Sequence, residues 1–164
     1  MKAYERWYEG IEQYFRKWEM LFDLLVFFNT WIPRLVYISY PLLLLFLIFT
    51  KDERAVKVLL VPFAAFLFTT IIRKVKNEPR PYEKYTIRPL IPREKKGESF
   101  PSRHTLSIMI IAFAFFYINP IIGILFFLLG ILLAAIRVLG GIHFPRDVIA
   151  AALISLVFGL IGFF

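Results

Sequence analysis

The longest uncharged run in the sequence extends over 32 residues, from Thr105 to Ile136. A helix needs only ~20 apolar residues to cross a membrane, so this run is too long for one crossing and suits two short ones. Asn119-Pro120 divides the run, because the residue before a proline is disfavoured in the helical conformation. We therefore expect membrane helices at 102–118 and 120–136.

Three other stretches are almost free of charge and predict membrane helices at 31–50, 55–72 and 148–164. Hydrophobic residues make up 59% of the chain and the mean hydropathy is +0.68, outside the range of soluble domains and of disordered chains. The 164 residues suit one domain, 1–164. The expected fold class is all-α: a polytopic membrane helix bundle with about five transmembrane helices.

The first 27 residues carry an aromatic stripe at helical spacing, opposed by mixed charges. The stripe consists of Tyr4, Trp7, Tyr8, Ile11, Tyr14, Phe15, Trp18, Leu21 and Phe22. This pattern predicts an amphipathic helix over residues 3–27 that lies in the membrane interface. The alternative is a helix that packs on a partner protein.

Residues 73–101 form the core of the one long polar stretch. Ten Lys and Arg residues and four Glu residues lie between Arg73 and His104, together with five prolines. The prolines prevent a regular helix, and polar backbone cannot face lipid. We expect a folded cap loop at one membrane surface.

Five crossings would bring three distant segments to that same surface. They are Arg73–Pro81, Pro101–His104 and Arg137–Asp147, and they contain both histidines of the chain. Asp147 is the only acidic residue after Glu98, and it precedes an uncharged crossing where an unpartnered carboxylate is costly. The three segments therefore predict a polar site.

These residue types suit metal-free phosphoryl transfer. The guanidiniums of Arg73, Arg80 and Arg137 match a tetrahedral oxyanion, and Ser102 begins a helix whose N–H groups favour anions. Two histidines can divide the roles of nucleophile and general acid, and a carboxylate four residues after His143 can reach its imidazole. A chain without cysteine has no thiol nucleophile and no thiolate metal site, and the site offers few other metal ligands. We expect a phosphohistidine intermediate, no metal and no cofactor.

The three segments resemble the motifs of the type 2 phosphatidic acid phosphatase superfamily, membrane lipid phosphatases that share an active site with vanadium haloperoxidases. The family pattern is Lys, six residues, Arg-Pro; then Pro-Ser-Gly-His; then Ser-Arg, five residues, His, three residues, Asp. Here the motifs read Arg73…Arg80-Pro81, Pro101-Ser102-Arg103-His104 and Ile136-Arg137…His143…Asp147. Three departures are Arg73 for lysine, Arg103 for glycine and Ile136 for serine.

The resemblance implies a role for each matching residue. His143 attacks phosphorus, Asp147 orients it, and His104 protonates the leaving oxygen and then activates water. Phosphate-binding residues are Arg73, Arg80, Ser102 and Arg137, and further expected substrate contacts are Lys74, Lys76, Arg103 and Gly141. Because the site lies at a membrane surface, a lipid head group is the expected substrate, with no nucleic-acid partner. The family offers undecaprenyl diphosphate, the lipid A 1-phosphate, phosphatidylglycerophosphate and phosphatidate.

Two features of the function stay open at this stage. The resemblance favours an active site on the extracytoplasmic face of a bacterial-type inner or plasma membrane, whereas 17 Lys and Arg residues on the motif side against three on the other favour the cytoplasmic face. The alternative functions are a non-catalytic phospholipid-binding membrane subunit and a vanadate-dependent haloperoxidase.

Overall fold

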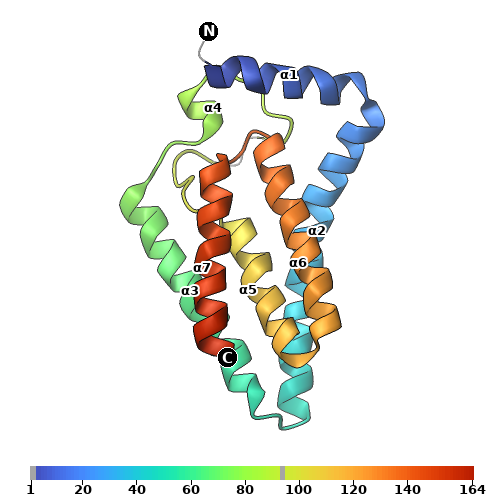
Figure 1. Cartoon of the computed structure of the whole chain (residues 1–164), viewed down its shortest axis with the longest axis vertical. Helices are drawn as coiled ribbons and strands as arrows, with labels where there is room; N and C mark the ends of the chain where they lie inside the picture. Colours follow the sequence, from blue (N-terminus) through green and yellow to red (C-terminus); the bar gives the residue numbers. More distant parts are fainter. Residues whose placement is uncertain (1–2, 93–94) are drawn as a thin grey trace.

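The structure, a computed structural model, describes residues 3–92 and 95–164 (Figure 1). Over these residues it contains helices and loops and no strand, which confirms the all-α fold class. The helices are α1 (Ala3–Lys17), α2 (Glu19–Phe49), α3 (Arg54–Lys76), α4 (Pro81–Lys84), α5 (Arg103–Ile118), α6 (Pro120–Leu139) and α7 (Pro145–Phe163). Helices α2, α3, α5, α6 and α7 contact one another in a bundle, and α1 lies across one end of it (Figure 1). The expected cap loop includes residues 93 and 94, which lie outside the described residues.

Helix α5 forms the centre of the bundle and contacts α2, α3, α6 and α7. It is apolar on all sides because all sides are packed; its fully or nearly fully buried side chains include Leu106, Ile108, Ile110, Ala112 and Ala114. Asn119 ends α5 and caps α6, since its side chain accepts hydrogen bonds from the N–H groups of Ile121 and Ile122. The uncharged run is therefore a tight helical hairpin.

Four helices, α2, α3, α6 and α7, lie in stretches long and apolar enough to cross a membrane. Helix α5 has 16 residues, or ~24 Å at 1.5 Å per residue, and is shorter than a typical crossing. It is covered by the other helices, so it does not need the length of a lipid-exposed span. Large apolar side chains on the outside of the other helices, such as Phe49, Phe63 and Ile161, are exposed as in a membrane protein.

The predicted bounds of the N-terminal segment are wrong. The first helix ends at Lys17 rather than at residue 27, and α2 begins at Glu19 rather than at residue 31. The chain turns at Trp18, whose φ of −113° and ψ of 86° interrupt the helix. No glycine or proline marks this turn, and the apolar run that located the membrane helix does not include its polar first turns.

The aromatic stripe of α1 divides between two environments. Tyr8 is fully buried, and Tyr4, Ile11 and Phe15 pack with it on the cap loop and on α6. Trp7, Tyr14 and Trp18 are about half exposed. Part of the stripe thus packs against the protein's own cap, while the position of the exposed part in the membrane interface stays a prediction.

Candidate active site

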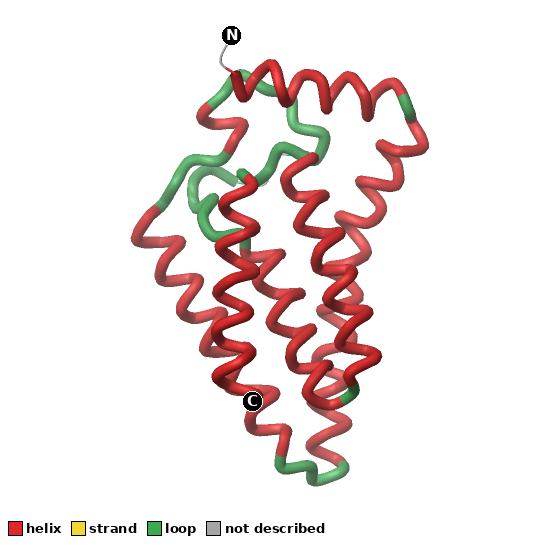
Figure 2. The backbone as a smooth tube through the Cα atoms, in the orientation of Figure 1, coloured by secondary structure: helices red, strands yellow, loops and turns green. Residues whose placement is uncertain are grey.

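The loops at the end of the bundle covered by α1 bring the three predicted segments together. Figure 2 shows the long loops between α3 and α5 and the loop between α6 and α7 at this end, and short turns at the other. The described polar side chains that are almost completely buried in this part of the protein include Arg73, Arg80, Ser99, Ser102, Thr105, Arg137, His143 and Asp147. Burial of so many polar groups in one place is typical of a functional site.

The central pair of the site is His143 and Asp147. The loop from Gly140 to Phe144 carries the histidine, and the aspartate occupies the first turn of α7. His143 Nδ1 lies 3.4 Å from Asp147 Oδ2, and both side chains are 1% exposed or less. Asp147 Oδ2 also accepts a hydrogen bond of 2.6 Å from the Ser99 hydroxyl and one of 3.0 Å from the Phe144 N–H. A carboxylate on Nδ1 leaves Nε2 as the free nitrogen of a neutral imidazole.

Burial lowers the pKa of His143 to about 4, because the charged imidazolium loses its hydration. Asp147 opposes this shift, and the positive charges of Arg137 and Arg80 reinforce it. His143 is therefore neutral at physiological pH. A neutral imidazole is the form that can act as a nucleophile.

Three buried arginines from separate elements lie at the same end of the bundle as this pair, and the charges of Arg137 and Arg80 act on His143. Arg73, in the last turn of α3, donates to the carbonyl of Pro101 and lies 3.7 Å from Glu98. Arg80 Nε donates to the Gly97 carbonyl at 3.2 Å, and Arg137 Nη1 donates to Asn29 Oδ1 of α2 at 3.1 Å. All three are 2% exposed or less. Buried guanidiniums oriented by protein oxygens suit the recognition of phosphate oxygens.

The cap loop is built to hold Arg80. Glu83 Oε2 accepts hydrogen bonds of 2.8 Å from the N–H of Arg80 and of 2.8 Å from the N–H of Gly97. Gly97 has a φ of +65°, and a Cβ there would lie 2.4 Å from Asn77 Oδ1. One carboxylate thus fixes both the backbone of Arg80 and the residue whose carbonyl binds its guanidinium.

Ser102 is the N-cap of α5. Its Oγ accepts hydrogen bonds from Thr105, and its own N–H donates to the Asp147 carbonyl at 3.0 Å. The α5 N-terminus therefore lies directly beside the start of α7. Its free N–H groups and helix dipole favour an anion at this point.

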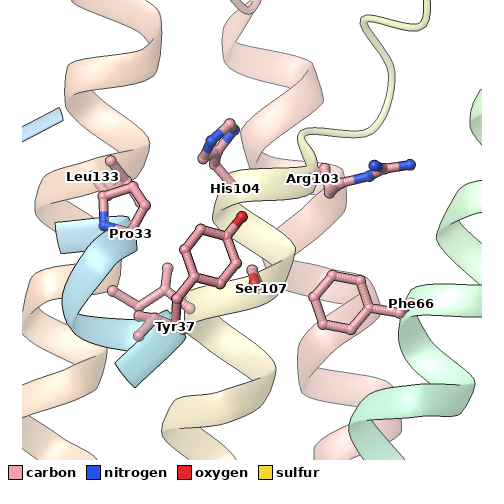
Figure 3. Close-up of a pocket in the computed structure, with 9 residues that line it drawn as sticks. Pro33, Tyr37, Phe66, Arg103, His104, Ser107 and Leu133 are labelled. Carbon is pink, nitrogen blue, oxygen red and sulfur yellow. The ribbon is translucent and has the colours of Figure 1, made fainter. Parts of the chain in front are cut away.

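His104 lies in the first turn of α5 and is half-buried. Together with Pro33, Tyr37, Phe66 and Leu133 it lines a cavity of ≈ 40 Å³ between α2, α3, α5 and α6 (Figure 3). Apart from His104, Arg103 and Ser107, the lining is apolar or aromatic, as expected next to a lipid chain. The predicted acid thus lies two residues after the Ser102 cap, beside a small and largely apolar cavity.

The further contacts expected from sequence lie differently. The side chains of Lys74, Lys76 and Arg103 are exposed, and Arg103 points away from His104 toward α3 (Figure 3). Gly141 lies beneath Tyr8, and its N–H donates to the Val138 carbonyl at 3.0 Å. A substrate contact through that N–H is therefore not available, and the close approach of Tyr8 accounts for the glycine.

Three residues of the site were missed by the sequence analysis. Ser99 lies next to the second motif without any pattern that identifies it. Asn29 carries a signal, because it is an amide in the largely apolar stretch Leu24–Ile32, where such groups usually bind a partner. Tyr8 belongs to the aromatic stripe but looks no different from its neighbours. Among the described residues, no group of three or more Asp, Glu or His side chains could hold a metal ion.

Comparisons with known proteins show what the chain as a whole is similar to. The family model described as PAP2 superfamily matches residues 54–163. Undecaprenyl-diphosphatase BcrC of Bacillus subtilis (strain 168) is 32% identical over 100 residues, which cover 61% of this chain and 51% of that protein. The chain thus spans about half the length of the curated relative that it matches.

Two solved structures are similar in fold. The crystal structure of Aquifex aeolicus LpxE has a TM-score of 0.70 and 28% identity, over 87% of this chain and 92% of that chain. The PAP2-type phosphatidylglycerolphosphate phosphatase of Bacillus subtilis has a TM-score of 0.68 and 20% identity, over 98% of this chain and 85% of that chain. The latter similarity supports the fold alone.

Proposed function

The chain belongs to the PAP2 superfamily, and from this premise we propose that it is a membrane phosphatase that hydrolyses the phosphate or diphosphate head group of a lipid without a metal ion. The observation that carries the proposal is the buried His143–Asp147 pair, at the same end of the bundle as three buried arginines from three separate segments. Binding alone would not need an imidazole held neutral with one nitrogen free.

In the first step, Nε2 of His143 attacks phosphorus while the bond from phosphorus to the lipid oxygen breaks. The Nδ1 proton stays hydrogen-bonded to Asp147, whose charge stabilises the imidazole as it becomes positive. His104 gives its proton to the departing lipid oxygen. The products are the dephosphorylated lipid and a phosphohistidine.

In the second step, His104 takes a proton from water, and the resulting hydroxide attacks the phosphohistidine. The P–N bond breaks, inorganic phosphate leaves, and His143 is neutral again. Arg73, Arg80 and Arg137 hold the phosphoryl oxygens in both steps and stabilise the charge of each transition state. Ser102 and the α5 N-terminus add donors on the same side.

The apolar side chains that line the cavity beside His104 support a lipid as the substrate. The leaving oxygen has to lie near His104, so the chain attached to it continues into the apolar surface formed by Pro33, Tyr37 and Phe66. The head group thus reaches the arginines while the hydrocarbon stays among the helices. Undecaprenyl diphosphate, lipid A 1-phosphate, phosphatidylglycerophosphate and phosphatidate all satisfy this requirement.

A phosphate-release assay on these four lipids in detergent tests the proposal. We expect release from at least one of them, retained activity in excess chelator, and inhibition by vanadate, which mimics the five-coordinate phosphorus. Loss of activity in chelator with recovery on adding a divalent cation would contradict the metal-independent mechanism. Tight lipid binding without release would favour a non-catalytic subunit.

We also propose that the active site faces the extracytoplasmic side, although the distribution of Lys and Arg favours the other side. The chain has no cysteine, so single thiols report the topology directly. Lys96 lies at the active-site end and Lys51 at the opposite end, and both are exposed. In intact cells an impermeant maleimide should label Lys96→Cys and leave Lys51→Cys unlabelled; the reverse result would place the site in the cytoplasm.

A further inference from the structure

Ser99 makes a contact that none of the three motifs explains. Its side chain is 0% exposed, its Oγ lies 2.6 Å from Asp147 Oδ2, and the same Oγ lies 3.5 Å from His143 Nδ1. A carboxylate can only accept, so the serine hydroxyl is the donor in the short contact. One side chain of the cap loop therefore touches both members of the central pair.

The cap loop holds Ser99 firmly in this position. The Ser99 N–H donates to the Glu78 carbonyl at 2.9 Å, and the preceding N–H of Glu98 donates to Asn77 Oδ1 at 3.2 Å. The hydroxyl thus comes from a backbone that is fixed on the α3 side of the site. Asp147 and His143 come from the other side, where α6 passes to α7.

The geometry of Asp147 shows what the hydroxyl contributes. Oδ2 receives the Ser99 hydroxyl, the Phe144 N–H and the Nδ1 side of His143. Oδ1 has no hydrogen bond to the described residues and lies 3.6 Å from Arg146 Nε, a longer ion-pair contact. At 3.4 Å, the contact from His143 is the longest of the three at Oδ2. The shorter contacts therefore determine where Oδ2 lies, and with it the direction of the Nδ1 proton.

We infer that Ser99 is a positioning residue: its hydroxyl holds the Asp147 carboxylate so that His143 keeps its proton on Nδ1 and presents Nε2 to phosphorus. This inference rests on the proposed function. It adds a fourth side chain to the catalytic unit, supplied by the cap loop rather than by the helix pair that carries the nucleophile. Ser99 itself does not touch the reacting phosphorus.

The kinetic test compares Ser99→Ala with Ser155→Ala. Ser155 is an equally buried serine, and its hydroxyl donates to the Ala151 and Leu106 carbonyls. It lies ~12 Å further along α7 than Asp147. Loss of a hydrogen bond to a charged group predicts that Ser99→Ala lowers kcat about ten- to a hundredfold, with KM changed less than threefold. Ser155→Ala should leave kcat within about twofold.

A double-mutant cycle separates positioning from general stability. In an Asp147→Asn background, Ser99→Ala should cost less than about threefold, because the group it positions is already impaired. An equal loss in both backgrounds, or a lower Tm with unchanged kcat, would overturn the inference.

A measurement without turnover distinguishes this inference from the proposed function. The chain has two histidines, so ¹⁵N-histidine labelling yields the signals of two imidazoles, and a His104→Gln variant assigns them. Ser99→Ala should shift the His143 nitrogens toward a mixture of tautomers, while Ser155→Ala should not. Unchanged His143 signals would refute the role of Ser99 even in an active enzyme. A shift in a protein that releases no phosphate would retain the role and reject the proposed function.

Discussion

Both ends of the helix bundle carry charged side chains, but these side chains are partly exposed at one end and buried at the other. At the end formed by the α2–α3 turn, Arg54 and Asp52 pair at 2.6 Å, two residues apart, with side chains 42% and 22% exposed. At the other end, Arg73, Arg80, Arg137 and Asp147 are almost fully buried, and the three arginines bind partners that are distant in sequence, as with Arg137 and Asn29. The first end is a solvated turn. The second is a structure assembled from many segments around buried charge.

The comparison shows that the buried end of the bundle bears the energetic cost of removing charged side chains from water. Transferring a charged group from water into the protein interior costs several kcal/mol. The attraction of a buried partner offsets this cost only if the geometry of the contact is good. An exposed ion pair has a small desolvation cost and contributes little to the free energy of unfolding, typically about 0–1 kcal/mol. A protein keeps several buried cations together where a ligand of opposite charge completes the network, so the buried end is where substitutions should matter.

The largest expected effect comes from His143→Ala. Without the nucleophile no phosphohistidine can form, so phosphate release should fall by at least about 10⁴-fold. Adding His104→Ala should lower the rate little further, because the two histidines act as one unit. Gel filtration and circular dichroism in detergent establish that the variant is folded. Substantial activity in folded His143→Ala would contradict the assignment of the site.

The sequence predicts which residues form this site better than it predicts which residues hold them in place. His143, Asp147 and the three arginines follow from motif spacing, and the membrane helices follow from uncharged runs. The partners of those residues do not follow, because Ser99 reaches Asp147 and Asn29 reaches Arg137 only through the folding of distant segments. The turn at Trp18 is not marked by glycine or proline, and the charges of Lys17 and Glu19 beside it read as part of the polar face of one continuous helix. Contacts between distant segments depend on how the helices and loops pack, and this packing produces no pattern among neighbouring residues in the sequence.

Arg73 and Lys74 sharpen the comparison within one helix turn. Arg73 is buried and donates to the Pro101 carbonyl, whereas Lys74 is exposed, since successive residues differ by ~100° around a helix. Arg73→Ala should lose a charge-assisted hydrogen bond of about 1.5–3 kcal/mol, or about ten- to a hundredfold in rate. Arg73→Lys should keep much of the activity, and Lys74→Ala nearly all. If phosphate release falls in Lys74→Ala and not in Arg73→Ala, the alignment of the first motif is wrong by one residue.

Gly141 tests how α1 holds the catalytic loop. Its φ is +74°, and a Cβ would lie 2.5 Å from the Tyr8 hydroxyl, which also accepts a hydrogen bond of 3.1 Å from the Leu90 N–H. Gly141→Ala should therefore destabilise the protein by about 2 kcal/mol. Gly10 is the matched control, because a Cβ there meets nothing within 4 Å and α1 is helical at that point. Gly10→Ala should stabilise by about 0.5–1 kcal/mol.

Thermal unfolding in detergent measures both glycine variants. A Gly141→Ala protein with unchanged Tm and rate would show that α1 lies loosely on the loop. The buried end would then be held by the arginine network alone.

The buried histidine predicts a dependence of stability on pH. Its pKa is lowered to about 4 in the folded protein, whereas the unfolded chain binds a proton near pH 6.5. The unfolded state therefore binds more protons between these values, so stability falls as pH decreases from 6.5 toward 4. At pH 6 the loss should be about 1 kcal/mol. Comparison of Tm between pH 7.5 and pH 5 should show a smaller decrease for His143→Gln than for the wild type; equal decreases would place the proton elsewhere.

The smallest effect is expected at the opposite end, from Arg54→Ala. The Arg54 guanidinium pairs with Asp52 and its side chain is 42% exposed, so solvent replaces the lost ion pair at little cost. Asp52 keeps its structural role in this variant, because its Oδ1 still accepts the N–H of residue 54 and its carbonyl the N–H of Ala55. Phosphate release and Tm should both stay within experimental error of the wild type. A tenfold loss of rate in Arg54→Ala would show that the solvated turn is coupled to the buried site through α2 and α3, and the contrast between the two ends would then be one of exposure and not of function.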